Sequence, residues 1–92
     1  MSDAFTLKVV TPTEVVFEGD VTSVTAPGGK GYLGILKNHA PLVTTIEKGN
    51  LSFRSPDGKT QSLKVEGGFL EVSQNRVLVL TDRVTSIPIA RP

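Results

Sequence analysis

The sequence contains no cysteine, no tryptophan, one histidine and one tyrosine among its 92 residues. The absence of cysteine excludes disulfide bonds and thiolate metal sites, and one histidine does not form a zinc site by itself. No apolar run approaches the roughly 18 residues of a membrane span. The opening segment MSDAFTLKVV lacks the basic and apolar regions of a secretory signal peptide. We therefore expect a soluble, intracellular protein, or the soluble part of a larger one, without disulfide bonds or a zinc site.

The charges show no excess of one sign, and the formal net charge is +1. A nucleic-acid-binding protein concentrates its basic residues in a patch or stripe and usually supplies aromatic rings for base stacking. The basic residues here occur singly: Lys8, Lys30, Lys37, Lys48, Arg54, Lys59, Lys64, Arg76, Arg83 and Arg91. We therefore expect no nucleic-acid partner.

Apolar residues recur with the two-residue period of β-strands, and no segment shows a helical stripe free of glycine and proline. The expected strands are 5–10, 15–19, 21–26, 31–35, 41–46, 51–54, 60–65, 67–73 and 76–81. About eight to ten short strands with regularly spaced turns are typical of an all-β sandwich or flattened barrel. We expect one domain over residues 1–86 and an extended tail over 87–92.

Three short segments predict turns or bends. Ser55-Pro56-Asp57-Gly58 is a hairpin turn, because proline presets φ, aspartate bonds the nearby backbone and glycine adopts positive φ. Gln74-Asn75 is a two-residue hairpin tip, in which asparagine tolerates positive φ. Gly67-Gly68 predicts a bend within a strand.

The segment GKGYLG, residues 29–34, matches the dinucleotide fingerprint G-x-G-x-x-G. That site needs a helix after the last glycine, because the helix N-terminus holds the pyrophosphate. Asn38 and Pro41 break any helix within two turns, and no Ser or Thr follows the lysine as in a Walker loop. We interpret Gly28, Gly29 and Gly31 as positions of positive φ in a tight loop. Gly34 indicates a bulge or a close approach by another backbone.

Catalytic chemistry has little support in the residues. His39 is expected to be a turn or interface residue, because no nucleophile elbow lies nearby and the carboxylates form no spaced cluster. Val77 to Leu80 are all apolar, as are Val15 to Phe17, although a half-solvated strand should alternate. Either a neighbouring loop covers these strands, or one face meets a partner; the pattern leaves both open.

Several ordered motifs resemble the epsilon subunit of F-type ATP synthases. The segment 31–42, GYLGILKNHAPL, resembles the family's Gly-x-(Leu/Phe)-Gly-(Ile/Val) followed shortly by His-Ala-Pro-Leu. The segments FEG at 17–19, VEGGFLEV at 65–72 and VLVLTD at 77–82 resemble further family motifs in the same order. The resemblance covers residues 5 to about 84.

The resemblance implies a flattened ten-stranded β-sandwich at the foot of the rotating central stalk. It implies binding to the gamma subunit and the c-ring, which couples ion-driven rotation to ATP synthesis, with no catalytic residue and no cofactor. It also implies a peripheral position at the cytoplasmic face of the bacterial cell membrane. The loop implied to meet the c-ring comprises Gly28, Gly29, Lys30, Gly31, Tyr32 and Leu33, and the positions implied to meet gamma are Thr11, His39, Ala40, Leu42 and Thr44.

Two departures from the family change what is expected. Family members often carry an acidic residue where this chain has Tyr32, so an electrostatic contact to a basic ring loop is lost, and Lys30 reverses its sign. Longer members add a C-terminal helical hairpin that inhibits ATP hydrolysis and in some cases binds ATP. If the printed sequence is the whole protein, we expect neither hairpin inhibition nor ATP binding.

Two alternatives to a rotor subunit stay open. One is a free-standing β-sandwich that binds sugar or peptide, which needs an aromatic-lined face, and the other is a small enzyme that uses His39.

Overall fold

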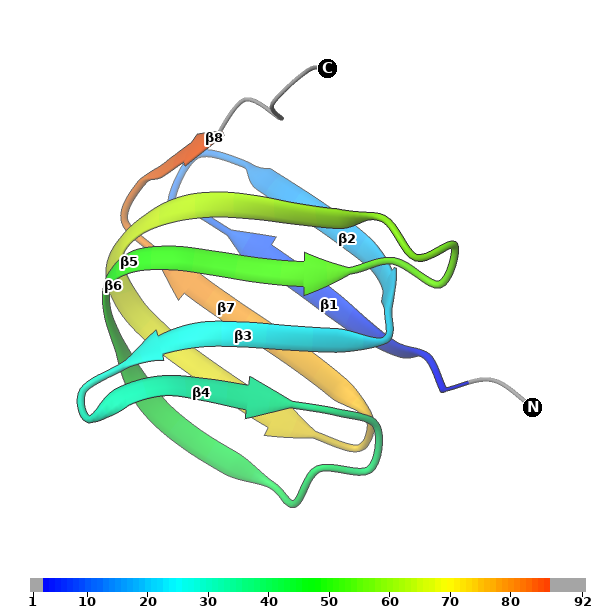
Figure 1. The fold of residues 1–92 in the computed structure, drawn as a ribbon. Coiled ribbons are helices and arrows are strands. Elements are labelled where there is room, and N and C mark those ends of the chain that lie inside the picture. Colours follow the sequence, from blue (N-terminus) through cyan, green and yellow to red (C-terminus); the bar gives the residue numbers. More distant parts are fainter. Residues whose placement is uncertain (1–2, 87–92) are drawn as a thin grey trace.

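The computed structural model describes residues 3–86, which form eight β-strands and no helix, so no helix of this part could cross a membrane (Figure 1). The all-β class predicted from the sequence is confirmed. The expected tail at 87–92 lies outside the described residues. The strands are β1 (Phe5–Val10), β2 (Val15–Val21), β3 (Ser23–Gly28), β4 (Gly31–Ile35), β5 (Leu42–Arg54), β6 (Thr60–Ser73), β7 (Arg76–Thr81) and β8 (Val84–Ser86).

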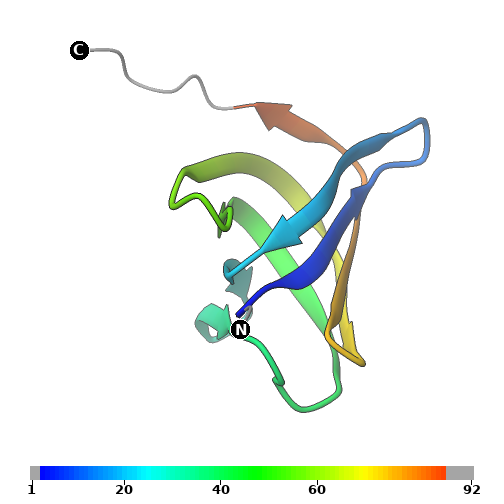
Figure 2. The same cartoon turned by 90° about the vertical axis from the view of Figure 1, so that its right-hand side faces the viewer.

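The strands build a sandwich of two layers that share β5 and β6. The strand order is β2-β1-β7-β6-β5-β3-β4, with β8 beside β6. The first layer contains β2, β1, β7, the end of β6 and the start of β5. The second layer contains β4, β3, the end of β5, the start of β6, and β8. Figure 2 shows the strong curvature of the green and yellow strands that pass from one layer to the other.

The eight strands lie within the eight to ten expected from the pattern and are two fewer than the ten implied by the resemblance, because β5 and β6 are long, with 13 and 14 residues. Their backbone pairing continues through the points where the sequence pattern breaks. Counting each long strand as two would give ten. The sheet is also not closed, since β2 and β4 lie at the two ends of the strand order. The structure is therefore a sandwich and not the flattened barrel that the pattern also allowed.

The corner between the layers is formed at Gly67 and Gly68 of β6. Their φ angles are +87° and +132°, a region that residues with a Cβ rarely adopt. Alternate residues of a strand face the same side, so a bend is required where the buried positions change parity. Along β6 the buried apolar positions change from odd to even numbers: Leu63, Val65, Leu70 and Val72. The pairing with β5 keeps one register on both sides of the corner, so both strands bend together, as Gly67-Gly68 predicted.

The core lies between the two layers and consists mainly of aliphatic and aromatic side chains, with Thr81 of β7 also buried. Phe53 of β5 is 1% exposed, and its ring centroid lies 4.4 Å from that of Phe17 on edge strand β2. Every other residue of β1 is buried, namely Phe5, Leu7 and Val9, as expected for a strand with one face on the core. No buried side-chain nitrogen or oxygen within residues 3–86 lacks a hydrogen-bond partner.

The two predicted hairpin turns are confirmed. Gly58 has φ of +90°, its amide donates to Ser55 O at 2.9 Å, and Asp57 Oδ1 accepts from Lys59 N at 3.0 Å. Gln74 and Asn75 both have positive φ at the tip joining β6 and β7. Two local expectations are wrong: the strand expected at 21–26 is divided between β2 and β3, and β8 was not expected.

Candidate functional site

The glycine loop, Gly28 to Gly31, joins β3 and β4 at the bend of the sandwich. A Cβ at Gly28 would lie 2.9 Å from Gly31 O, and Gly31 has φ of +117°. Gly28 and Gly29 do not have positive φ, so that expectation is confirmed for Gly31 alone. Gly28 is required because two backbone segments approach closely. A strand follows the loop, so no helix N-terminus faces a phosphate site there.

Gly34 was expected to mark a bulge or a close backbone approach, and this is wrong. A Cβ at Gly34 would meet nothing within 4 Å. The pairing of β3 with β4 is regular from Val24↔Ile35 to Gly28↔Gly31. Position 34 therefore has space for a side chain on the exposed face of β4.

Tyr32 lies across the outer face of the second layer, beside the glycine loop. It pairs with Pro27 of β3, and its hydroxyl reaches β5, where a Cβ at Gly49 would lie 3.6 Å from Tyr32 Oη. The same Cβ would lie 3.0 Å from Pro27 Cβ. Gly49 therefore leaves room for the proline and the tyrosine. Tyr32 remains 62% exposed, so most of the side chain is available to a partner.

His39 lies in the turn between β4 and β5. Its Nδ1 donates to Ala40 O at 2.7 Å, and its amide donates to Leu36 O at 3.2 Å. No hydroxyl or carboxylate in the described part of the chain is hydrogen-bonded to the ring. Asn38, with φ of +66°, donates its amide to Asn75 Oδ1 at 2.8 Å, which ties this turn to the β6–β7 tip. The arrangement is that of a structured turn.

Thr11 lies in the turn between β1 and β2, at the opposite end of the first layer from His39. It is 9% exposed, its amide donates to Glu14 O at 2.9 Å, and its hydroxyl accepts from Thr13 N at 3.4 Å. The strand register places Thr11 beyond Val10, whereas the His39 turn lies near the start of β1. The two turns are therefore roughly 15–20 Å apart along β1.

The five positions implied to meet gamma thus do not form one cluster. Leu42 packs against the core, and Thr44 is half-buried with its hydroxyl donating to Thr45 O at 3.2 Å. Ala40 is exposed at the start of the same segment. The structure brings Ala40, His39 and Leu42 together and leaves Thr11 at the far end of the layer.

Next to the Thr11 turn, the outer face of the first layer carries a row of apolar residues across four strands. The register aligns Phe69 with Leu80, Leu80 with Val10, and Val10 with Val15. Phe69, Val15 and Leu80 are 56%, 51% and 45% exposed. No described segment covers this row. The sequence signal was the unbroken apolar run at 77–80; Phe69 was missed, although it alternates with buried Leu70.

The apolar row continues beside a shallow hollow of about 220 Å³, whose lining residues are Val43, Phe69, Leu70, Glu71, Leu78 and Leu80. Toward the other end of the layer the same face becomes charged. A larger hollow of about 540 Å³ there is lined by charged, hydroxyl, amide and aliphatic side chains, without an aromatic ring: Thr6, Lys8, Glu18, Glu71, Ser73, Gln74, Arg76, Val77 and Leu78. This lining lacks the aromatic platform expected of a sugar-binding module.

Metal-ligating side chains do not gather in groups of three or more anywhere in residues 3–86. The candidate site consists of the two surfaces described above: the glycine loop with Tyr32, and the apolar row of Val10, Val15, Phe69 and Leu80.

Comparison with known proteins assigns this chain to a family. Residues 4–87 match the family described as ATP synthase, Delta/Epsilon chain, beta-sandwich domain. The chain is similar to the ATP synthase epsilon chain of Chlorobium limicola, with 44% identity over 82 residues that cover 89% of this chain and 93% of the relative. It is 45% identical over 76 residues to the ATP synthase epsilon chain of Leptospira borgpetersenii, covering 83% of this chain and 59% of the relative.

Solved structures show the same fold. The chain aligns with a chain in the cryo-EM structure of the Euglena gracilis mitochondrial ATP synthase, with a TM-score of 0.87, 22% identity, and coverage of 94% of this chain and 55% of the other. It also aligns with a chain in the central stalk/c-ring structure of the Tetrahymena thermophila mitochondrial ATP synthase, with a TM-score of 0.77, 16% identity, and coverage of 88% and 65%. The extent of the family match and the identity to the bacterial epsilon chains show that this chain belongs to the ATP synthase delta/epsilon family, whose β-sandwich domain it contains.

Proposed function

We propose that this chain is a non-catalytic central-stalk subunit of an F-type ATP synthase, and that it attaches gamma to the c-ring so that ion-driven rotation is coupled to ATP synthesis. The observation that carries the proposal is the uncovered apolar row on the first layer. Large apolar side chains that lie side by side and half-exposed are typical of a surface that is covered in an assembly. The names of the relatives support an ATP synthase as that assembly.

In this proposal gamma covers the outer face of the first layer. A partner lying diagonally across this face contacts the Thr11 turn at one end, crosses the apolar row, and reaches the His39–Ala40 turn at the other. Leu42 and Thr44 then support the start of β5 from the inner side. This geometry explains how turns roughly 15–20 Å apart can belong to one interface.

The c-ring in turn meets the glycine loop and the start of β4. The surface comprises Gly28, Gly29, Lys30, Gly31, Tyr32 and Leu33. Bare glycine backbone permits close approach by another chain, and the exposed tyrosine supplies contact area and a hydroxyl. A subunit bound in this way is held at the cytoplasmic face of the bacterial cell membrane by the complex alone.

A crossed pair of variants tests the two surfaces. Phe69→Ala should weaken binding to purified gamma by about 1–2 kcal/mol, because a half-exposed large side chain loses its burial in the complex. The same variant should leave binding to the detergent-solubilised c-ring unchanged. Tyr32→Ala should weaken binding to the c-ring and leave binding to gamma unchanged. If the wild-type chain binds neither gamma nor the c-ring, the proposal is wrong.

A further inference from the structure

The carboxylate of Glu47 lies beside the glycine loop, although the two are separated by 16 or more positions in the sequence. A Cβ at Gly29 would lie 3.7 Å from Glu47 Oε2, an ordinary contact distance. Glu47 is on β5 next to Ile46, which pairs with Gly28. The carboxylate is therefore part of the same surface as the loop, supplied by a different strand.

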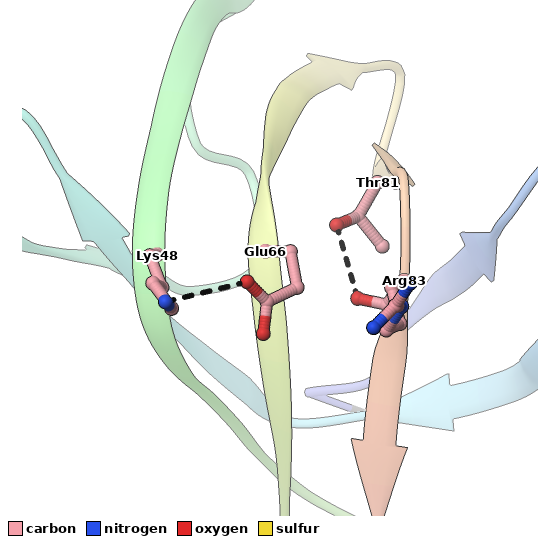
Figure 3. Close-up of polar contacts among 4 residues, drawn as sticks. All are labelled: Lys48, Glu66, Thr81 and Arg83. Carbon is pink, nitrogen blue, oxygen red and sulfur yellow. Dashed lines mark hydrogen bonds and ion pairs between the residues drawn. The ribbon is translucent and has the colours of Figure 1, made fainter.

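The carboxylate of Glu47 makes no ion pair or hydrogen bond within the described residues. The adjacent Lys48 is already engaged, since its Nζ lies 3.6 Å from Glu66 Oε1 on the neighbouring strand (Figure 3). Figure 3 also shows Thr81 Oγ1 donating to Arg83 O at 3.5 Å on the other side of β6. Lys30, in the loop itself, makes no ion pair with Glu47 in this structure. The exposed surface thus presents one unpaired carboxylate and one unpaired ammonium.

Docking of another protein against the loop would remove water from Glu47. An ionised carboxylate that loses its hydration without a counter-charge is strongly unfavourable. The long side chain of Lys30 can turn away into solvent, because it projects from the tip of a loop. Glu47 has less freedom, because it lies within β5 between Ile46 and Lys48, which pair with Gly68 and Glu66 of β6.

We propose that Glu47 is a partner-facing residue of the glycine-loop surface, and that the c-ring loop docking there places a cationic side chain against its carboxylate. This inference rests on the proposed c-ring attachment and specifies its chemistry. A partner without a cation at this point would bury the carboxylate unpaired, so charge complementarity favours a partner that supplies one. Glu47 thereby selects c-rings whose facing loop carries arginine or lysine at this position.

The test measures the affinity of the full chain, assembled with gamma, for the detergent-solubilised c-ring at low and at high salt. Glu47→Gln removes the charge and keeps the shape of the side chain. It should weaken binding about 10-fold at low salt. This loss lies between the loss expected on removing an exposed ion pair and that on removing a buried one. The salt dependence of binding should also decrease, because one screened attraction is lost. Asp57→Asn, which removes an exposed carboxylate from the 55–58 turn outside both proposed surfaces and keeps the oxygen that accepts from Lys59 N, should change neither quantity.

The Lys30→Met variant distinguishes two possible cations for Glu47: one supplied by the c-ring, and Lys30 of the same chain, which could pair with Glu47 on docking. If the cation belongs to the c-ring, Glu47→Gln weakens binding as much in the Lys30→Met background as in the wild type. Loss of the Glu47→Gln effect in that background would assign the pairing to Lys30 and overturn the inference. Wild-type binding with no effect of Glu47→Gln would also overturn it, whereas no wild-type binding to the c-ring would refute the proposed attachment itself.

Discussion

Replacing Gly68 by alanine would place a methyl group inside the backbone of β7. Gly68 has φ of +132°, and its Cβ would overlap the carbonyl oxygen of Leu80. It would also lie 2.9 Å from Leu80 C and 2.9 Å from Thr81 Cα. These are backbone atoms of a paired strand, so the clash is relieved only by moving β7 away from β6 at the corner.

The loss of stability has two parts. The positive φ costs about 1–2 kcal/mol for a residue with a Cβ. Moving β7 weakens roughly two ladder hydrogen bonds, at about 1 kcal/mol each. The sum, about 3–4 kcal/mol, is a large share of the roughly 5–14 kcal/mol expected for a domain of this length. It corresponds to a fall in Tm of about 12–30 °C.

Urea denaturation followed by circular dichroism measures this change. Gly67→Ala is the matched comparison, because Gly67 has φ of +87° but its Cβ would make only an ordinary contact, 3.5 Å from Ile46 O. We expect it to lose only the strain part, about 1–2 kcal/mol. Gly34→Ala should be neutral or stabilising by up to about 1 kcal/mol, because its Cβ enters open space on a regular strand. A Gly68→Ala protein as stable as Gly67→Ala would refute the steric account of the corner.

Three further substitutions test the core, the Tyr32 surface and the His39 turn. Phe53→Ala should lower the free energy of unfolding by about 3–5 kcal/mol, because it empties the centre of the core, and denaturation curves measure it. Gly49→Ala should cost about 1–2 kcal/mol and change the fluorescence of Tyr32, which is the single tyrosine of a chain without tryptophan. Asn75→Ala should cost about 1–2 kcal/mol and speed amide exchange at Asn38, since it loses the hydrogen bond to that amide and keeps a positive φ. Unchanged exchange at Asn38 would show that the bond does not hold the turn.

Local signals predicted local structure well. The Ser55–Gly58 turn and the Gln74–Asn75 tip depend on the backbone preferences of the residues that form them, and both are confirmed. The expected strand at 31–35 coincides with β4. The continuity of β5 and β6 was missed, because Gly49 and the Gly67–Gly68 pair interrupt the alternation while the pairing continues past them.

Features that depend on distant pairings were not predictable from the sequence. The parallel pairing of β1 with β7 joins Leu7 to Val77, and no local pattern specifies it. It is this pairing that aligns the apolar row. Likewise, Glu47 reaches the glycine loop only because β5 bends beside β3. The unbroken apolar run at 77–80 indicated a second apolar face, either covered by a loop or open to a partner, but the residues that complete it come from β1, β2 and β6.

The two long strands also determine how firmly the two layers are joined. In a sandwich whose sheets are joined only by loops, the sheets can shear past one another by side-chain rearrangement. Here the covalent backbone of β5 and β6 runs without interruption from one layer into the other, in a single register. Slippage of the layers would require that ladder to break. If the chain joins gamma to the c-ring as proposed above, a torque applied to the outer face of the first layer would therefore reach the glycine loop with little loss through deformation of the sandwich.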